Sequence, residues 1–563
     1  MGLPWRFMSV TSLATAVLLT SQHVHPSKSF FLATFTTTWS LSFLAWAVWK
    51  VFLWPKFFSP LRGLPEPEGG HWLMGQYRTI VSQPSGHPHI DWVNNLRHDG
   101  LIRYQFLFNQ ERVLVASPKT LSEVLVTRNY DFVKPTAVRW SIGNILGVGI
   151  LLAEGDEHKL QRKKLMPAFA FRHVKDLYPV FWSKSLDGVR AMTEHILAES
   201  TNAADSPTTA TAVLEVGAWA SRVTLDIIGV AGLGHDFGAI RNPDNPLVRT
   251  YQHVFKPSRQ GQLLGLASLF LPGRLVRMIP VERNNDILRA SRVIRSTCRD
   301  LIREKKDKLA KDQLTDMDIL SVALESGAFT DENLVDQMMT FLAAGHETTA
   351  SAMTWAVYLL CLHPEMQSRL RAEVRAHLPS PDAPGADAAV TATDIDRRLP
   401  YLSAVCSEVL RYFPPVPMTL REAAVDTTIN GQRIPKGTRV MLCPWAVNKD
   451  VSLWGDDAGV FNPDRWLAPA GENGAGNGEK ATASGGASSN YAFMTFLHGP
   501  RSCIGQGFAK AEFACILASW VGRFEFSLKN EEEYDEDKVD IKGGVTARPA
   551  KGLYVNATVV DGW

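Results

Sequence analysis

Residues 29–49 carry no charged side chain, and this run constrains the chain more than any other feature of the sequence. The stretch reads SFFLATFTTTWSLSFLAWAVW, and a helix of about 20 apolar residues is long enough to cross the hydrocarbon layer of a membrane. Residues 7–22 form a second uncharged run, for which a cleaved signal peptide is the alternative interpretation. We therefore predict a membrane anchor over residues 1–56, made of one transmembrane helix or two.

Aromatic and basic residues follow closely at the end of this anchor. Trp46 and Trp49 are suited to a membrane interface, and Lys50, Lys56 and Arg62 come directly after them. Because positively charged flanks tend to stay on the cytosolic side, we expect everything after the anchor to face the cytosol.

The rest of the chain predicts one long folded region with two interruptions. A Pro- and Gly-rich linker is expected at residues 57–75, and the main domain at residues 76–563. Low-complexity insertions are expected near residues 378–394 and 468–490, because both stretches are too poor in apolar residues to pack. The formal net charge is +2 and no basic run alternates with aromatic residues, so nucleic-acid binding is not expected.

Helical signals dominate the main domain. Thr330, followed by two acidic residues, is a typical N-cap, and the sequence then stays compatible with a helix over residues 331–362. A second helix is predicted from Pro400 to the next pair of prolines. Asn430 and Gly431 lie between two β-prone runs and predict a hairpin. The expected fold class is mainly α with minor β (α+β).

The middle of the long predicted helix contains the segment AGHETTA, residues 344–350. Glycine costs about 1 kcal/mol inside a helix relative to alanine, so its presence calls for a reason. The Thr348 hydroxyl can bond the Ala344 carbonyl and bend the helix, and Glu347 adds a carboxyl group. Such a groove can deliver protons to a bound small molecule; a polar stripe on a partly exposed helix is the alternative. We expect His346 to be structural.

Near the C-terminus, the sequence FLHGPRSCIGQGF places Cys503 between glycines and just before a helical run. A cysteine at a helix N-terminus, beside Arg501, lies in an environment that favours the thiolate. A buried free cysteine in a glycine-rich turn is the alternative. The six cysteines include no C-x-x-C pair, so neither a disulfide framework nor a zinc site is expected.

Two further groups of charged residues are spaced for contact on a helix. Glu408 and Arg411 are three residues apart on one helix face, and Arg465 could join them in a buried network. His158 and Arg162 are four residues apart in a basic segment, which either meets an anionic cofactor or is a solvated surface.

Taken together and in this order, the motifs resemble those of the cytochrome P-450 family, and in particular its membrane-bound fungal members. The resemblance extends from about residue 60 to the C-terminus. The loop residues that match the family's haem-binding loop are Phe496, Gly499, Arg501, Cys503 and Gly505.

Two other positions matter to this resemblance. The family usually has a tryptophan where this chain has His158, and histidine can still donate a hydrogen bond to a haem propionate. Arg421 matches a family position that pairs with a propionate.

The resemblance implies the cytochrome P-450 prism fold, preceded by the membrane anchor and enclosing haem b. Cys503 would be the axial ligand of the iron, with Phe496 packed nearby and Gly499 and Gly505 letting N–H groups approach the sulfur. The side chains expected to pair with the propionates are Arg501, Arg162, Arg421 and His158.

The resemblance also implies a reaction, in which one oxygen atom from O2 is inserted into a lipophilic small molecule, with Glu347 and Thr348 delivering protons. A haem-thiolate isomerase or dehydratase and a non-enzymatic haem carrier are the alternatives. Fungal secondary metabolism is the expected setting, and polyketide, terpenoid and fatty-acid skeletons all remain open as substrates.

Electrons would come from another protein. Only 60 residues follow Cys503, too few for a flavin domain, and no dinucleotide-binding glycine fingerprint follows a predicted strand. The expected partners are an NADPH-cytochrome P-450 reductase and also cytochrome b5, at the endoplasmic reticulum membrane with the catalytic domain on the cytosolic side.

Overall fold

Apolar helices account for most of the buried side chains in the computed structural model, which describes residues 4–22, 27–200, 210–245, 249–250, 259–267, 273–313, 318–468, 481–543 and 545–563. The chain divides into two compact units, and each is described by itself. The first comprises Met1–Gln83, Asp91–Val133 and Leu420–Leu442, and the second comprises Pro84–Ile90, Lys134–Thr419 and Cys443–Trp563.

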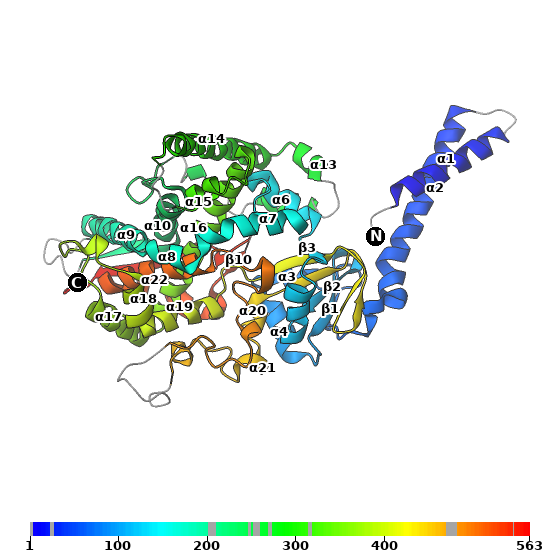
Figure 1. Cartoon of the computed structure of the whole chain (residues 1–563). Helices are drawn as coiled ribbons and strands as arrows, with labels where there is room; N and C mark the ends of the chain where they lie inside the picture. Colours follow the sequence, from blue (N-terminus) through cyan, green and yellow to red (C-terminus); the bar gives the residue numbers. More distant parts are fainter. Residues whose placement is uncertain are drawn as a thin grey trace. The chain divides into compact units, whose positions relative to one another are not determined.

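The first unit begins with two apolar helices that lie side by side, α1 (Trp5–Ser21) and α2 (Lys28–Val48) (Figure 1). The buried residues of α1 are Met8, Ser12 and Ala16, which recur every four residues and so form one stripe. From Lys28 the helix continues to Phe58, and this 31-residue stretch is long and apolar enough to cross a membrane. The helix ends two residues past the predicted anchor boundary.

The predicted linker at residues 57–75 is packed rather than free-standing. Leu61 is buried, and Glu66 forms an ion pair with Arg103 at 2.7 Å. The Arg103 guanidinium also donates to the Pro55 carbonyl at 2.8 Å. A single buried arginine therefore joins the end of the long apolar helix, the predicted linker and the first strand.

The first unit also contains a five-stranded sheet, in the order β1-β2-β8-β5-β3. Strands β1 and β2 are antiparallel, whereas β2 and β8 are parallel. Asn430 and Gly431 both have positive φ, as a tight hairpin turn requires, and they join β6 to β7. The predicted hairpin is confirmed. The elements are α3 (Tyr77–Ser82), α4 (His87–Asn95, divided between the units), β1 (Leu101–Phe106), β2 (Gln110–Val115), α5 (Pro118–Ser122), β3 (Phe132–Val133), β5 (Thr419–Ala423), β6 (Thr427–Ile429), β7 (Gln432–Ile434) and β8 (Arg439–Leu442).

The second unit is built around α16 (Asp331–Leu362), which Figure 1 labels among the other helices of this unit. The Thr330 side chain accepts from the Asn333 N–H, and the helix stops before Pro364, so both predicted ends are confirmed. The helices of this unit are α6 (Thr136–Leu146), α7 (Gly155–Leu165), α8 (Phe171–Asp176), α9 (Tyr178–Glu199), α10 (Val216–Ile227), α12 (Arg259–Ala267), α13 (Gly273–Met278), α14 (Glu282–Ala310), α15 (Ile319–Glu325), α17 (Pro364–His377), α18 (Ala392–Arg398), α19 (Pro400–Tyr412), α20 (Pro444–Val447), α21 (Val451–Trp454) and α22 (Gln506–Arg523).

Short strands complete this unit, and its three-stranded sheet has the order β4-β12-β9 with antiparallel pairs. A separate antiparallel hairpin pairs β10 with β11. The mainly helical fold with minor β structure is confirmed. The strands are β4 (Thr211–Glu215), β9 (Phe524–Leu528), β10 (Ile541–Gly543), β11 (Ala547–Pro549) and β12 (Tyr554–Val559).

One of the two expected insertions packs against the core. In residues 378–394, Ala386 and Val390 are each only 1% exposed, and the Trp182 indole N–H donates to the Ala386 carbonyl at 3.0 Å. The expectation of an unpacked stretch was wrong here, because small aliphatic side chains fill space beside a large aromatic ring. Within the second stretch, 468–490, residues 469–480 lie outside the described residues.

Candidate functional site

The cysteine-containing loop closes on itself just before α22. The Cys503 N–H donates to the Phe496 carbonyl at 2.9 Å, and the Ser502 N–H donates to the Gly499 carbonyl at 3.0 Å. Gly499 has a φ of 78°, a left-handed conformation that favours glycine. These bonds hold the sulfur-bearing residue three positions before the first residue of the helix.

Cys503 is exposed, whereas the other five cysteines are all buried. Protein atoms around its sulfur nevertheless desolvate the thiol, and this burial raises the pKa of Cys503. The Gly505 N–H and the positive charge of Arg162 act in the opposite direction. Desolvation outweighs the Gly505 hydrogen bond and the Arg162 charge, so the protein alone does not favour the thiolate as the sequence predicted. A coordinating metal ion would deprotonate a thiol here outright.

Arg501 belongs to the loop and is paired with a carboxylate that sequence reasoning missed. Its Nη2 is 2.5 Å from Oε2 of Glu154, and the two side chains are only 4% and 11% exposed. The other Glu154 oxygen accepts from the Lys134 N–H at 2.8 Å. Glu154 stands just before α7, and its sequence context gives no sign of a partner so distant in the chain.

Helix α7 brings His158 and Arg162 to the same loop. Arg162 donates to the Ser502 carbonyl at 2.6 Å, next to Cys503. Burial, together with the positive charges of Arg501, Lys134 and Arg162, lowers the pKa of His158 to about 4. His158 is therefore neutral near pH 7 and keeps one ring N–H as a donor.

The structure thus gathers Arg162, His158 and Arg501 around the Cys503 loop. Arg421 belongs to the first unit, where it is buried on β5 and donates to the Leu420 carbonyl at 3.0 Å.

On α16, the Thr348 hydroxyl donates to the Ala344 carbonyl at 2.8 Å, as the sequence suggested. Ala344 is exposed although the neighbouring Ala343 is buried, so this turn of the helix is open on one side. The reason for Gly345 is packing, because a Cβ there would come within 2.9 Å of the Ile228 side chain.

Glu347 points toward the C-terminal hairpin. Its Oε1 is 3.0 Å from Nη1 of Arg548 and accepts from the Thr546 hydroxyl at 3.3 Å. His346 is buried, its Nδ1 lies 2.6 Å from the Leu342 carbonyl, and burial lowers the pKa of its imidazole. This environment suits a structural histidine.

The comparison with known families decides what this arrangement is. The sequence model described as Cytochrome P450 matches residues 65–555. The chain belongs to the cytochrome P450 family.

Related P450 monooxygenases cover nearly the whole chain. It is 46% identical to the cytochrome P450 monooxygenase ALT8 of Alternaria alternata, over 92% of this chain and 93% of that protein. It is 45% identical to FUM15 of Gibberella moniliformis, over 95% of each chain. It is 44% identical to sphH of Aspergillus fumigatus, over 94% of each chain. All three are named cytochrome P450 monooxygenases, and this chain is an oxidoreductase of that class.

As a P450, the protein binds haem through a cysteine thiolate, and the residues at the loop fit such a group. Cys503 is an exposed residue that can serve as a ligand, while the other five cysteines are buried. Arg162 and Arg501 supply positive charge, and His158 supplies a neutral donor, beside the same loop. These are the side chains that anionic propionates require.

A buried ionic network in this P450 is centred on two residues of α19. Arg411 and Glu408 are fully buried and form two hydrogen bonds, at 2.8 and 2.7 Å. Arg465 donates to the same carboxylate at 3.1 Å, and the indole N–H of Trp466 donates at 2.8 Å. The structure brings together all three residues that the sequence grouped, and it adds Trp466.

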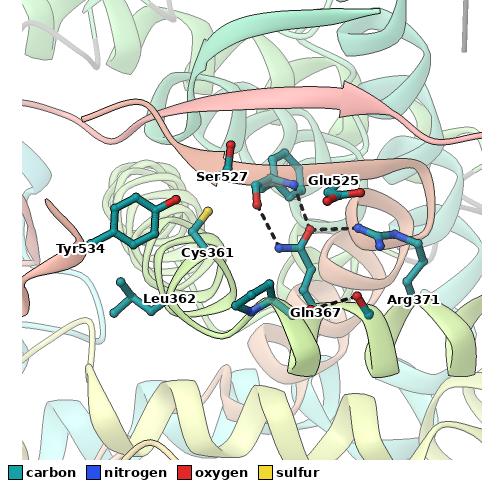
Figure 2. Close-up of a pocket in the computed structure, with 10 residues that line it drawn as sticks. Cys361, Leu362, Gln367, Arg371, Glu525, Ser527 and Tyr534 are labelled. Atoms are coloured by element: carbon teal, nitrogen blue, oxygen red, sulfur yellow. Dashed lines mark hydrogen bonds between the residues drawn. The ribbon is translucent and has the colours of Figure 1, made fainter. Parts of the chain in front are cut away.

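Figure 2 shows a pocket of about 330 Å³ where α16 meets α17 and β9, and none of the residues predicted for the haem site lines it. The Gln367 amide donates to the Phe526 carbonyl at 3.1 Å and accepts from the Phe526 N–H at 2.9 Å. Arg371 also donates to Gln367, at 2.9 Å. The two Gln367–Phe526 bonds fasten α17 to β9, which gives the polar lining of the pocket a structural role.

Proposed function

We propose that this chain is a membrane-anchored P450 monooxygenase in which Cys503 is the axial haem ligand. The reaction would insert one oxygen atom from O2 into a lipophilic small molecule of fungal secondary metabolism. The observation that carries the proposal is the loop itself, which holds an exposed cysteine just before α22 by bonds from Cys503 and Ser502. Haem with a thiolate ligand supplies the electron density that favours O–O cleavage.

The residues around the loop would hold the haem propionates. Arg501 is part of the loop and its side chain is only 4% exposed, while half-buried Arg162 contacts the loop at Ser502. Partial desolvation strengthens the attraction of such charges for an anion. His158, neutral near pH 7, would donate a hydrogen bond where the family usually has tryptophan. Arg421 is assigned to a propionate by its match to the family pattern.

Three other loop residues would position the sulfur. The Phe496 carbonyl already accepts the Cys503 N–H, and its ring would pack beside the ligand. Gly499 permits the left-handed turn, and the Gly505 N–H opposes the rise in the thiol's pKa. Together they would direct N–H dipoles at the thiolate.

Glu347 and Thr348 would deliver protons to the reacting oxygen. The Thr348 hydroxyl lies in the open turn of α16 beside exposed Ala344, and Glu347 comes directly before it in the chain. A positioned hydroxyl and carboxyl can transfer protons in the transition state.

The substrate would be apolar. Phe341 and Ala344 are on the helix that carries Glu347 and Thr348, and the Phe341 ring packs edge-on against Phe169 with 5.7 Å between centroids. The similarity to fungal monooxygenases supports a place in fungal secondary metabolism. Polyketide, terpenoid and fatty-acid skeletons are the lipophilic substrate classes that we propose to test.

Electrons would come from a separate NADPH-cytochrome P450 reductase, with cytochrome b5 as a further partner. The apolar helix from Lys28 to Phe58 supports an anchor in the endoplasmic reticulum membrane, followed by a cytosolic catalytic domain. The basic residues after the anchor favour this orientation.

The test uses the full-length chain in membranes with a fungal reductase. We expect a reduced carbon monoxide spectrum typical of thiolate ligation, and product that depends on both NADPH and O2 when a panel of the three skeleton classes is supplied. Absence of the thiolate-type spectrum would refute the role of Cys503. Product formed without NADPH would identify an isomerase instead of a monooxygenase.

A further inference from the structure

Strand β11, which forms the C-terminal hairpin with β10, is fastened to one face of α16 by the Ala547 carbonyl group. The Ala547 carbonyl accepts from the Ser351 hydroxyl at 2.7 Å and from the Trp355 indole N–H at 2.9 Å. The Ala547 N–H donates to the Pro415 carbonyl at 2.8 Å. Both backbone groups of Ala547 are therefore satisfied, and its place against the helix is fixed.

This docking places Glu347 beside the same strand. Ser351 and Trp355 follow Glu347 by four and eight residues, so all three share one face of α16. Arg548 on β11 and Thr546, which directly precedes the strand, flank Ala547 in the chain. Both of these side chains meet Oε1 of Glu347, at 3.3 Å and 3.0 Å.

The two oxygens of Glu347 are consequently different. Oε1 is held by a hydroxyl and a guanidinium, whereas Oε2 is 3.9 Å from Nε2 of His346. Among the described residues, His346 from α16 and Arg548 from β11 are the titratable or charged groups that face this carboxyl. The Glu347 side chain is 14% exposed, so the interaction with Arg548 is only partly screened by solvent.

We propose that Arg548 is a positioning residue for the reaction. Arg548 holds Glu347 through Oε1, so that Oε2 is the oxygen that exchanges protons at the open turn of α16. Thr546 assists as a neutral donor. The inference rests on the proposed proton-delivery role of Glu347. It assigns a new role to the C-terminal hairpin, because any movement of β11 against α16 would change the position of the acid.

Arg548→Gln tests the proposal, since it removes the charge and keeps a polar side chain of similar reach. In the reconstituted holoenzyme we expect product per NADPH to fall roughly threefold to tenfold and hydrogen peroxide to rise, as when a positioning contact is lost. Arg548→Lys should recover most of the coupling, because it restores the charge. Arg369→Gln is the matched control, because Arg369 is 40% exposed and ion-paired with Asp464, against 39% for Arg548.

A second readout is independent of turnover. The carboxyl infrared band that Glu347→Gln removes is recorded at one fixed pH in the substrate-free ferric protein. Its frequency should differ between Arg548→Gln and the wild type, because Oε1 of Glu347 loses its guanidinium partner. An unchanged band frequency together with wild-type coupling overturns the proposal, whatever the melting temperature of the variant.

The outcomes separate this inference from the function on which it rests. Wild-type coupling in Glu347→Gln refutes the proton-delivery role itself. Impaired coupling in Glu347→Gln with wild-type behaviour of Arg548→Gln refutes only the role of Arg548. The double variant should be no worse than Glu347→Gln alone, since Arg548 acts through that carboxyl; an additive loss would contradict this.

Discussion

The Thr349 hydroxyl on α16 donates to the carboxyl of Glu512 on α22 at 2.9 Å, and this contact joins the helix that carries Thr348 to the helix that follows Cys503. Glu512 is fully buried, and burial raises its pKa well above the ordinary value. The carboxyl is therefore protonated in the folded protein over a pH range in which an exposed glutamate is ionised.

The Glu512 carboxyl should make stability depend on pH. The unfolded chain releases this proton near the ordinary carboxyl pKa, whereas the folded protein keeps it to higher pH. Stability then falls by about 1.4 kcal/mol per pH unit between the two pKa values. Glu512→Gln cannot ionise, so we expect the melting temperature of this variant, relative to wild type, to increase from about pH 5 to pH 8. A difference that stays constant over this range would show that Glu512 ionises normally.

Removal of the Thr349 hydroxyl should destabilise the protein directly. Thr349→Val leaves the buried Glu512 carboxyl without this donor, which typically costs about 1–3 kcal/mol. Thr354→Val is the control, because the buried Thr354 hydroxyl donates only to a carbonyl of its own helix, that of Ala350. Denaturant unfolding of both variants measures the difference, and equal losses would contradict a special role for the Thr349–Glu512 contact.

Replacement of the proposed ligand should remove the haem-thiolate signature. Cys503→Ser is expected to lose the thiolate-type carbon monoxide spectrum and turnover, because an oxygen ligand does not supply the same electron push. Cys298→Ser changes a buried cysteine on α14 and should retain both properties. Activity that survives in Cys503→Ser would overturn the assignment of this residue.

Local signals explain which parts of the fold were predictable. Thr330 and the proline at 364 mark the two ends of α16, and Asn430-Gly431 marks the β6–β7 turn, because each acts on its immediate neighbours. The packing of residues 378–394 was missed because it depends on Trp182, which lies far away in the chain.

In the candidate site, too, residues with local signals could be predicted and long-range contacts could not. Motif residues such as Cys503 and Thr348 could be named because their spacing is characteristic. Glu154, Glu512 and Arg548 contact the motif residues or their direct neighbours. These three could not be named, since a lone acidic or basic residue has no distinctive spacing and is usually solvent-exposed.

The buried network around Glu408 should be essential to stability. Its carboxylate accepts from Arg411 and Arg465 while it is fully buried, and breaking one partner of such a pair costs roughly 3–5 kcal/mol because a buried charge is left uncompensated. We expect Glu408→Gln to lower the free energy of unfolding by about this amount. Glu365→Gln, at a side chain that is 68% exposed, should have little effect. A loss below about 1 kcal/mol in Glu408→Gln would mean that the network is not important for stability.

Loss of the Thr348 hydroxyl should separate electron use from product formation. Thr348→Ala removes the group that bonds the Ala344 carbonyl in the open turn of α16, while Cys503 and its loop are left unchanged. We expect a normal carbon monoxide spectrum and continued NADPH use. Product should fall by roughly 10²-fold or more, since positioned proton transfer contributes about 10²–10⁴-fold. The electrons from NADPH should then appear in hydrogen peroxide instead of in product. Thr354→Ala is the matched control, because its hydroxyl also bonds a carbonyl four residues back but is buried away from the groove. If Thr348→Ala keeps the wild-type ratio of product to NADPH, this threonine only shapes the helix, and proton delivery must use another group.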